Sequence, residues 1–337
     1  MTSRKSEQEG ERIAKRIARA GLCSRREAEQ WIFAGRVEVN GKPIASPALN
    51  VSAADRIKVD GKPLPERERT RLFLYHKPRG LVTSARDPEG RPTLFERLPR
   101  HLPRLVSIGR LDLNSEGLLL LTNDGGLARV LELPKTGWLR RYRVRAHGRV
   151  SQAALDALAA GITVDGIRYG SIEARLDREQ GSNLWLTFAM REGKNREIRN
   201  VLGALGLQVN RLIRISFGPF RLGEMAEGAV EEVATRVLRE QIGERVAQEA
   251  GADFAAPVLR RTLDTSPLEG EVDRPKAGRE GGSIRESSSE KIRRGLLTDR
   301  KGRRVAVEHI GVAKERRPPK HRTARDRGRK PRKRKRS

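Results

Sequence analysis

The stretch GRLDLNSEGLLLLTNDGG, residues 109–126, holds four consecutive leucines and decides how the middle of the chain folds. A short apolar run between polar residues is typical of a buried strand. Asp112 stands just before the leucines, and Arg110 is the cation beside it in sequence. We therefore expect a buried strand with an acidic side chain at its mouth.

The composition of the chain predicts a polyanionic partner. Its 337 residues carry 71 Lys plus Arg against 43 Asp plus Glu, a net charge of +28. Such an excess is typical of proteins that contact phosphates, because each contact releases condensed counterions. An anionic membrane would compete as partner, but the sequence shows no long amphipathic basic helix and no apolar run of membrane-spanning length. We predict nucleic acid as the partner and no membrane.

The cysteine and histidine content favours neither disulfide nor metal chemistry. Cys23 is the single cysteine, which fits a reducing cytoplasm. The start, MTSRKSEQEGER, lacks the hydrophobic core of a secretion signal. The five histidines are scattered without metal-ligand spacing. We expect a cytoplasmic protein with no metal and no cofactor.

The first region, residues 9–64, has the pattern of a small module of two helices and short strands. ERIAKRIARAGL is a helical pattern that Gly21 ends. Ser24 and Glu27 have capping-box spacing before a second helix that ends near Gly35. Strands follow in RVEVNG and DRIKVDG, each closed by an Asn-Gly or Asp-Gly turn.

Within this region, RIAKRIARAGLCSRREAEQWIFAGRVEVNGK resembles the S4 RNA-binding domain, a small alpha-L module. The resemblance implies that a set of basic and polar side chains faces RNA phosphates. These are Arg12, Lys15, Arg16, Ser24, Arg25, Arg26 and Lys42. The alternative is that the arginines only solvate a helical surface.

Residues 71–240, after a charged linker at 65–70, have the composition of a packed domain. Strand patterns are RLFLYHK, LVSIG, GLLLLTN, RYRVRAHG, LWLTFAM and VNRLIRISFG, and helical patterns are SQAALDALAAG, NREIRNVLGALG and VEEVATRVLREQ. We expect an α+β chain whose second domain has a mixed, mostly antiparallel sheet.

Residues 248–337 lose these patterns. TSPLEGEVDRPKAGREGGSIRESSSEK is rich in Gly, Ser, Pro and charge, and KERRPPKHRTARDRGRKPRKRKRS at the end is dominated by Lys and Arg. We predict a disordered basic C-terminal extension. It either binds RNA non-specifically, with strong salt dependence, or serves as a solubilising or localisation tail.

The opening stretch resembles the signature motif of the pseudouridine synthases of the RsuA and RluB type, which isomerise uridine in ribosomal RNA. Three further stretches match in the family's order: HKPRGLVTS at 76–84, RRYRVRAHG at 140–148 and REGKNREIRNVLGALGLQVNRLIRISFGPF at 191–220. The family's usual lysine is Arg140 here, and LPKTGW replaces its usual HPS-type stretch. The resemblance covers roughly residues 10–240.

The resemblance implies a role for three residues. Asp112, in G-R-L-D, would be the catalytic carboxylate, and Tyr142 the active-site tyrosine. Arg199, in E-I-R, would be the cation paired to Asp112. Arg110, Lys194 and Arg196 are expected to contact RNA.

The chemistry of uridine isomerisation fits these choices. The bond from the sugar to the base nitrogen breaks, and the base rejoins the same sugar carbon through carbon 5, so no redox step is needed. An ionised carboxylate would either attack the sugar or base, or remove a sugar proton. Because desolvation favours the protonated acid, a neighbouring arginine is needed to keep the charge. On NREIRNVLGAL, Arg199 stands at the edge of the apolar stripe, where it can pair inward.

The alternation of RYRVRA supports a special position for Tyr142. Strand periodicity turns Tyr142 inward, where its ring can stack on a flipped base and its hydroxyl can help to remove the carbon 5 proton. A buried core tyrosine is the alternative. The outward Arg141, Arg143 and Arg145 fit a surface laid against RNA.

We therefore predict a cytoplasmic, monomeric, cofactor-independent ribosomal RNA pseudouridine synthase. Within the family, the long basic C-terminal extension favours the branch that acts on 23S rRNA over the 16S rRNA branch. The alternative from another class is a non-catalytic RNA-binding or ribosome-assembly factor that uses the first module and the tail.

Overall fold

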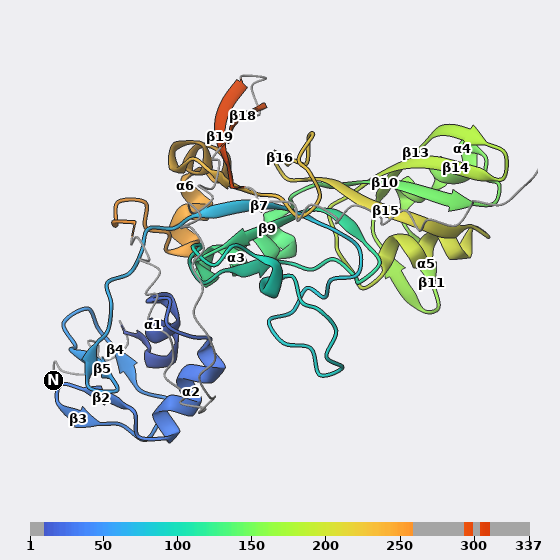
Figure 1. Cartoon of the computed structure of the whole chain (residues 1–337). Coiled ribbons are helices and arrows are strands. Elements are labelled where there is room, and N and C mark those ends of the chain that lie inside the picture. Colours follow the sequence, from blue (N-terminus) through green and yellow to red (C-terminus); the bar gives the residue numbers. More distant parts are fainter. Residues whose placement is uncertain (1–9, 259–292, 299–303, 311–337) are drawn as a thin grey trace, which may run out of the picture.

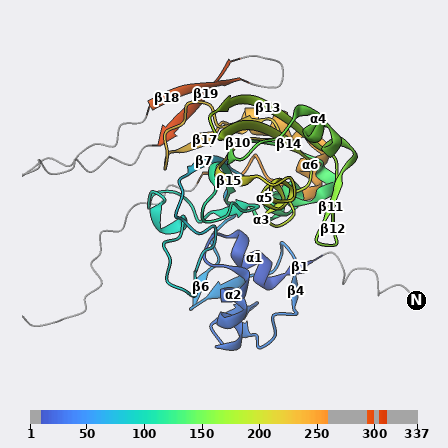
Figure 2. The ribbon, with the colours of Figure 1, turned by 90° about the vertical axis from the view of Figure 1, so that its right-hand side faces the viewer.

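A computed structural model describes residues 10–258, 293–298 and 304–310 of the chain (Figure 1). A small N-terminal module, blue in Figure 1, lies beside a domain built on one large sheet, and Figure 2 shows the same arrangement from a second side. Within the described residues, no helix is long and apolar enough to cross a membrane.

The N-terminal module packs two helices against short strands. Its core is formed by apolar side chains that include Ile13, Ile17, Ala28 and Ile32. The helices are α1 (Ile13–Arg19) and α2 (Arg25–Phe33), and the strands are β1 (Glu11–Arg12), β2 (Val37–Val39), β3 (Lys42–Pro43), β4 (Asn50–Val51), β5 (Ile57–Val59) and β6 (Lys62–Pro63). Strands β3, β2, β5 and β6 form one sheet in that order, and β1 pairs with β4.

Local sequence signals of this module are confirmed. Ser24 and Glu27 form the reciprocal capping box at the start of α2. Asn40 and Asp60, each followed by glycine, adopt φ values of 52° and 49° in the two hairpin turns. Both residue types tolerate this left-handed conformation, which explains why Asn-Gly and Asp-Gly predict the turns.

The second domain is built on an eleven-stranded sheet with the order β13-β14-β10-β15-β9-β7-β17-β19-β18; in addition β16 pairs with β15 and β8 with β9. Strands β9 and β15 run parallel, whereas the other pairings are antiparallel. The strands are β7 (Leu72–Lys77), β8 (Val106–Ile108), β9 (Glu116–Thr122), β10 (Arg140–His147), β13 (Ile172–Gln180), β14 (Asn183–Met190), β15 (Gln208–Phe217), β16 (Phe220–Arg221), β17 (Val230–Val233), β18 (Arg293–Thr298) and β19 (Arg304–Ile310).

The leucine run forms the central strand β9, and its residues alternate between two cores. Leu118 and Leu120 belong to the core on one face of the sheet, and Leu119 and Leu121 to the core on the other face. All four are fully buried. Burying a leucine contributes on the order of 1.5–3 kcal/mol, so β9 is held firmly from both sides.

Helices cover both faces of this sheet. Helices α3 (Gly125–Glu132) and α6 (Thr235–Ala250) contribute to the core that contains Leu118. Helices α4 (Gln152–Asp156) and α5 (Glu197–Ala204) contribute to the core that contains Leu119. The remaining elements are η1 (Phe95–Arg97), η2 (Pro134–Thr136), η3 (Ala157–Ala160) and the hairpin of β11 (Ile162–Val164) and β12 (Ile167–Tyr169).

The helical prediction for VEEVATRVLREQ is wrong in its first third. Residues Val230–Val233 form β17, which pairs antiparallel with β7, and the helix begins only at Thr235. Strand pairing overrides the local helical pattern here, because the free edge of β7 is available for pairing and Val230 and Val233 are buried in the core.

The predicted C-terminal extension, 248–337, falls mostly outside the described residues. Three parts of it are described: the end of α6 with the residues up to 258, and the backbones of β18 and β19. The latter two pair with each other, and β19 also pairs with β17.

Candidate active site

Asp112 lies on the loop between β8 and β9. Its side chain is 36% exposed, so it is open to a substrate while its neighbours are packed. Leu111 before it and Glu116 after it are buried. The predicted placement, an acid at the mouth of a buried strand, is confirmed.

The backbone of this loop is held by hydrogen bonds at five consecutive carbonyls, residues 111–115. Most of the donors come from the segment 77–83, the HKPRGLVTS stretch. Thr83 Oγ1 donates to Leu111 O (2.7 Å), Lys77 Nζ to Asp112 O (3.2 Å) and Ser115 O (2.9 Å), Gly80 N to Leu113 O (2.8 Å), and Arg199 Nη2 to Asn114 O (3.4 Å). Because no carbonyl of residues 111–115 is left unpaired, the loop presents the Asp112 side chain from a fixed backbone.

Lys77 is the buried cation beneath this loop. It is fully buried, and Nζ donates to three carbonyl oxygens, the third being Pro78 O at 3.1 Å. Burial lowers the pKa of Lys77 to about 8, and the carboxylates of Asp112 and Glu116 oppose that shift. Sequence reasoning did not assign Lys77 a role, although Lys77 lies in the matched stretch HKPRGLVTS.

Glu116 is fixed at the start of β9. Its carboxylate accepts two hydrogen bonds from Arg211 of β15, at 2.7 and 3.0 Å, and its side chain is 3% exposed. Next to it, Gly117 adopts φ +104°, and a Cβ there would stand 2.4 Å from the carbonyl oxygen of Arg214. Only glycine allows this close approach of β9 and β15.

Tyr142 points inward from β10, as predicted. It is 9% exposed and packs in the same cluster as Leu111, the residue next to Asp112. Its neighbours in the sheet are Phe188 of β14 and Arg214 of β15. The alternation of β10 is complete, with the three outward arginines exposed.

Arg214 is a buried cation that sequence reasoning missed. It is 3% exposed, its Nε donates to Leu118 O at 2.7 Å, and its Nη2 is buried without a partner in the described structure. It occupies the register position beside Tyr142. A buried guanidinium nitrogen without a hydrogen-bond partner is uncommon and marks Arg214 as a candidate for a special role. The sequence signal that could have identified it is a charged residue at an inward-facing position of the strand pattern LIRIS, residues 212–216.

The cations around Asp112 differ from the prediction in one respect. Arg196 Nη1 stands 4.0 Å from Asp112 Oδ2, whereas Arg199 is not within ion-pair distance of Asp112 in the described part of the chain. Arg199 instead donates to Val209 O (3.2 Å) and Asn114 O. Arg196 adopts a left-handed conformation (φ 51°) at the N-cap of α5, three residues before Arg199.

Arg199 nevertheless lies in the electrostatic field of the site. Burial lowers its pKa, the positive charges of Arg196 and Arg79 lower it further, and Asp112 opposes them. The charges of Arg196, Arg79 and Asp112 therefore all act on Arg199. Such a group of basic side chains attracts phosphates.

The predicted RNA contacts are mostly exposed but do not share one face. Lys15 and Arg16 are partly buried and lie within 4 Å of Glu11, at 3.3 and 3.7 Å. The hydroxyl of Ser24 caps α2. The exposed members are Arg12, Arg25, Arg26, Lys42, Arg110, Arg141, Arg143, Lys194 and Arg196. Arg141 and Arg143 lie on the opposite face of β10 from Tyr142.

A cavity of about 610 Å³ lies on that opposite side. Its lining includes Trp138, Arg141, Arg221 and Gly243, where α6 is kinked. Neither Asp112 nor Tyr142 lines it, so the cavity is not the site that holds the reactive carboxylate.

The chain thus combines a basic N-terminal module with a sheet domain that presents one partly exposed carboxylate on a well-bonded loop. Comparison with known proteins identifies it further. The S4 domain family matches residues 11–57, and the RNA pseudouridylate synthase family matches residues 71–204.

Relatives extend the match over most of the chain. An uncharacterized RNA pseudouridine synthase of Rickettsia felis is 46% identical over 228 residues, 68% of this chain and 99% of the relative. The ribosomal large subunit pseudouridine synthase B of Pseudomonas aeruginosa is 38% identical over 298 residues, 85% of this chain and 77% of the relative. A crystal structure of a pseudouridylate synthase is 28% identical, covers 69% of this chain and 99% of its own, and has a TM-score of 0.49. The chain belongs to the RNA pseudouridine synthase family.

Proposed function

We propose that this protein converts a specific uridine of ribosomal RNA, in the 23S rRNA of the large subunit, into pseudouridine, with Asp112 as the catalytic carboxylate. The observation that carries the proposal is the loop 111–115, whose every carbonyl is bonded while the Asp112 side chain stays open. The names of relatives from Pseudomonas aeruginosa, Pasteurella multocida and Haemophilus influenzae, at 38–39% identity, support the large-subunit substrate.

One carboxylate can carry out most of the chemical steps of this reaction. The bond between the sugar carbon 1′ and base nitrogen 1 breaks, the detached uracil turns, and carbon 5 bonds to carbon 1′. Carbon 5 then gives up its proton and nitrogen 1 gains one, so atoms balance without a co-reactant. Asp112 either forms a transient bond with the nucleoside or takes a proton from the sugar, and its ionised form serves both routes.

Tyr142 and the arginines complete the site. A uridine reaches Asp112 only if it is flipped out of its RNA helix, and the ring of Tyr142 offers a surface for the flipped base. Its hydroxyl can take part in moving the carbon 5 proton. Arg196 and Arg199 supply positive charge beside Asp112, and the unused N–H of Arg214 is a donor for a base or sugar oxygen.

RNA would be held by the exposed basic side chains of the N-terminal module and of the loop before α5. The charge of +28 supports this polyanionic partner, as does the S4 family match. The same proposal places the protein in the cytoplasm, where it meets ribosomal RNA, and has it act as a monomer.

The test is tritium release from 23S rRNA labelled at carbon 5 of uridine. Asp112→Asn is expected to abolish release while RNA binding stays at the parent level, because the substitution removes the charge but keeps the shape. Asp165→Asn is the matched control: Asp165 is exposed, and its φ of 50° suits asparagine. It should release tritium like the parent protein.

Three results would contradict the proposal. Continued turnover by Asp112→Asn would remove Asp112 from the chemistry and favour a different carboxylate. Turnover by the parent protein of labelled 16S rRNA alone would move the substrate to the small subunit. A parent protein that binds ribosomal RNA but never releases tritium would favour a ribosome-assembly factor.

A further inference from the structure

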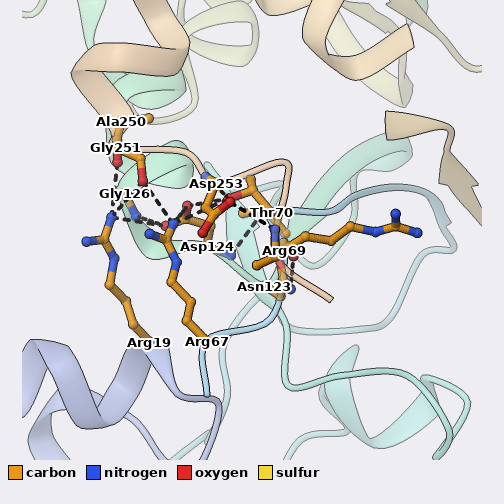
Figure 3. Close-up of polar contacts among 12 residues, drawn as sticks. Arg19, Arg67, Arg69, Thr70, Asn123, Asp124, Gly126, Ala250, Gly251 and Asp253 are labelled. Atoms are coloured by element: carbon orange, nitrogen blue, oxygen red, sulfur yellow. Dashed lines mark hydrogen bonds and ion pairs between the residues drawn. The ribbon is translucent and has the colours of Figure 1, made fainter. Parts of the chain in front are cut away.

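Asp124, near the end of the opening stretch, joins three segments of the chain (Figure 3). Its side chain is 3% exposed. Oδ1 accepts a hydrogen bond from Gly126 N at 2.8 Å and so caps α3. Oδ2 accepts from Thr70 Oγ1 (2.8 Å) and Arg67 Nη2 (2.7 Å), both in the linker before the second domain.

The third segment is the N-terminal module. Its residue Arg19, at the end of α1, reaches Asp124. Arg19 Nη2 stands 3.7 Å from Asp124 Oδ1 and donates to Ala250 O (3.1 Å) and Gly251 O (3.4 Å) at the end of α6. A cation at these carbonyls also suits the negative end of the helix dipole. The Arg19 side chain is only 16% exposed. Its Nη2 atom thus reaches the second domain.

The chain after α6 ties down the linker as well. Thr70 N donates to Asp253 O at 2.6 Å, and Asp253 N donates to Thr70 Oγ1 at 3.1 Å. Arg69 N donates to Pro257 O at 3.1 Å. The linker between the two domains is therefore bonded along its second half and does not act as a loose tether.

Gly126 shows how closely these parts approach. A Cβ at this position would stand 2.3 Å from Ala250 O and 2.9 Å from Arg19 Nη2. The sequence N-D-G-G thus supplies both the carboxylate that the arginines bind and the space through which Arg19 reaches it.

Capping of α3 does not explain this arrangement. An N-cap needs only a side-chain oxygen for a backbone N–H, and asparagine or serine serves equally well. The negative charge of Asp124 instead serves the two guanidinium groups of Arg67 and Arg19, although Arg19 also pairs with Glu11 of its own module at 3.2 Å. Another ion pair between the two domains, Arg86 to Glu27 at 3.1 Å, has an 87% exposed arginine and is a weak restraint.

We propose that Asp124 and Arg19 form a latch that fixes the orientation of the N-terminal module on the catalytic domain, and that this orientation decides which uridine of a bound RNA reaches Asp112. The RNA-binding module and the reaction site act as two linked binding sites. Fixing their geometry raises the effective concentration of one uridine at Asp112 and lowers that of its neighbours. Asp124 and Arg19 are positioning residues. The inference rests on the proposed function for its substrate.

The test compares Asp124→Asn with the parent full-length chain on 23S rRNA. Asparagine keeps the cap of α3 but loses the charge that holds both arginines. We expect KM to rise about ten-fold or more because the effective concentration falls, while kcat stays near the parent value. Pseudouridine should also appear at uridines next to the normal position. Trypsin should cut faster after Arg67 or Arg69, since the linker is released.

Asp60→Asn is the matched control. Asp60 also binds an arginine with both oxygens, at 2.7 and 2.6 Å from Arg36, but this pair lies within the N-terminal module. Its φ of 49° suits asparagine. Both variants make the protein more positive, so charge alone would tighten RNA binding in both. The latch predicts a raised KM in Asp124→Asn only.

Arg19→Gln tests the same contact from the other side and leaves the cap of α3 untouched, so it carries the test if Asp124→Asn does not fold. It should reproduce the rise in KM and the loss of position. Parent-like KM, position and linker cleavage in Arg19→Gln would overturn the latch, as would a rise in KM shared by Asp60→Asn. If the parent modifies no ribosomal RNA, the proposed function fails, and the linker cleavage rates still decide whether the latch exists.

Discussion

Removal of one hydroxyl group, in Thr83→Val, tests whether the clamped loop is what makes Asp112 effective. Thr83 Oγ1 donates to Leu111 O at 2.7 Å and accepts from Leu111 N at 3.3 Å, so it binds both backbone groups of the residue before Asp112. Valine has the same shape and lacks both interactions. Asp112 itself is not touched.

The expected loss follows from burial. Thr83 is 8% exposed and Leu111 is 7% exposed, so water replaces the lost hydroxyl poorly. Leaving such backbone groups without a partner costs on the order of 1–3 kcal/mol of folding free energy. A shift of the catalytic group by about 1 Å can cost about 100-fold in rate. We expect kcat to fall by about 10- to 100-fold, with a much smaller change in KM.

The assay is tritium release under saturating RNA, together with urea unfolding. Thr83→Ser is the matched variant, because it keeps the hydroxyl and loses a methyl group; its kcat should stay within about twofold of the parent. If Thr83→Val loses stability as expected and still turns over like the parent, the clamp is structural only and the reasoning is refuted.

Three further predictions concern other parts of the site. Gly117→Ala should lower the free energy of unfolding by about 3 kcal/mol or more, because the added Cβ meets the Arg214 carbonyl at 2.4 Å; an unchanged urea midpoint would contradict the close strand approach. The folded pKa of Lys77 is about 8 against 10.5 for the free side chain, so above pH 8 the unfolded chain binds the proton more strongly. The free energy of unfolding of the parent, relative to that of Lys77→Met, should therefore rise by about 3 kcal/mol between pH 7 and 10.5. If calorimetry shows that this difference does not change with pH, the lowered pKa of Lys77 is contradicted. Tyr142→Phe keeps the ring, so RNA affinity by filter binding should hold while tritium release falls by about 10-fold or more; equal release would remove the hydroxyl from proton transfer.

Features that depend on neighbouring residues could be predicted from the sequence. The capping box at Ser24, the turns at Asn40 and Asp60, and the alternation around Tyr142 are set by backbone geometry over a few residues. The placement of Asp112 followed from the leucine run. Each of these depends on periodicity or turn chemistry that the sequence displays directly.

Features set by tertiary contacts could not be predicted in the same way. Which arginine approaches Asp112 depends on how α5 docks, and Arg196 adopts a left-handed conformation that no local pattern announces. The role of Lys77 appears only when its strand brings Nζ beneath the loop, 35 residues away from Asp112. VEEV became a strand because β7 was available beside it.

The most direct test of the central claim is to map pseudouridines in ribosomal RNA from cells that lack this protein. The account predicts that one uridine of 23S rRNA is left unmodified. The parent gene should restore the modification at that position, and Asp112→Asn should not. Full restoration by Asp112→Asn, or an unchanged pseudouridine map in cells without the protein, would contradict the account.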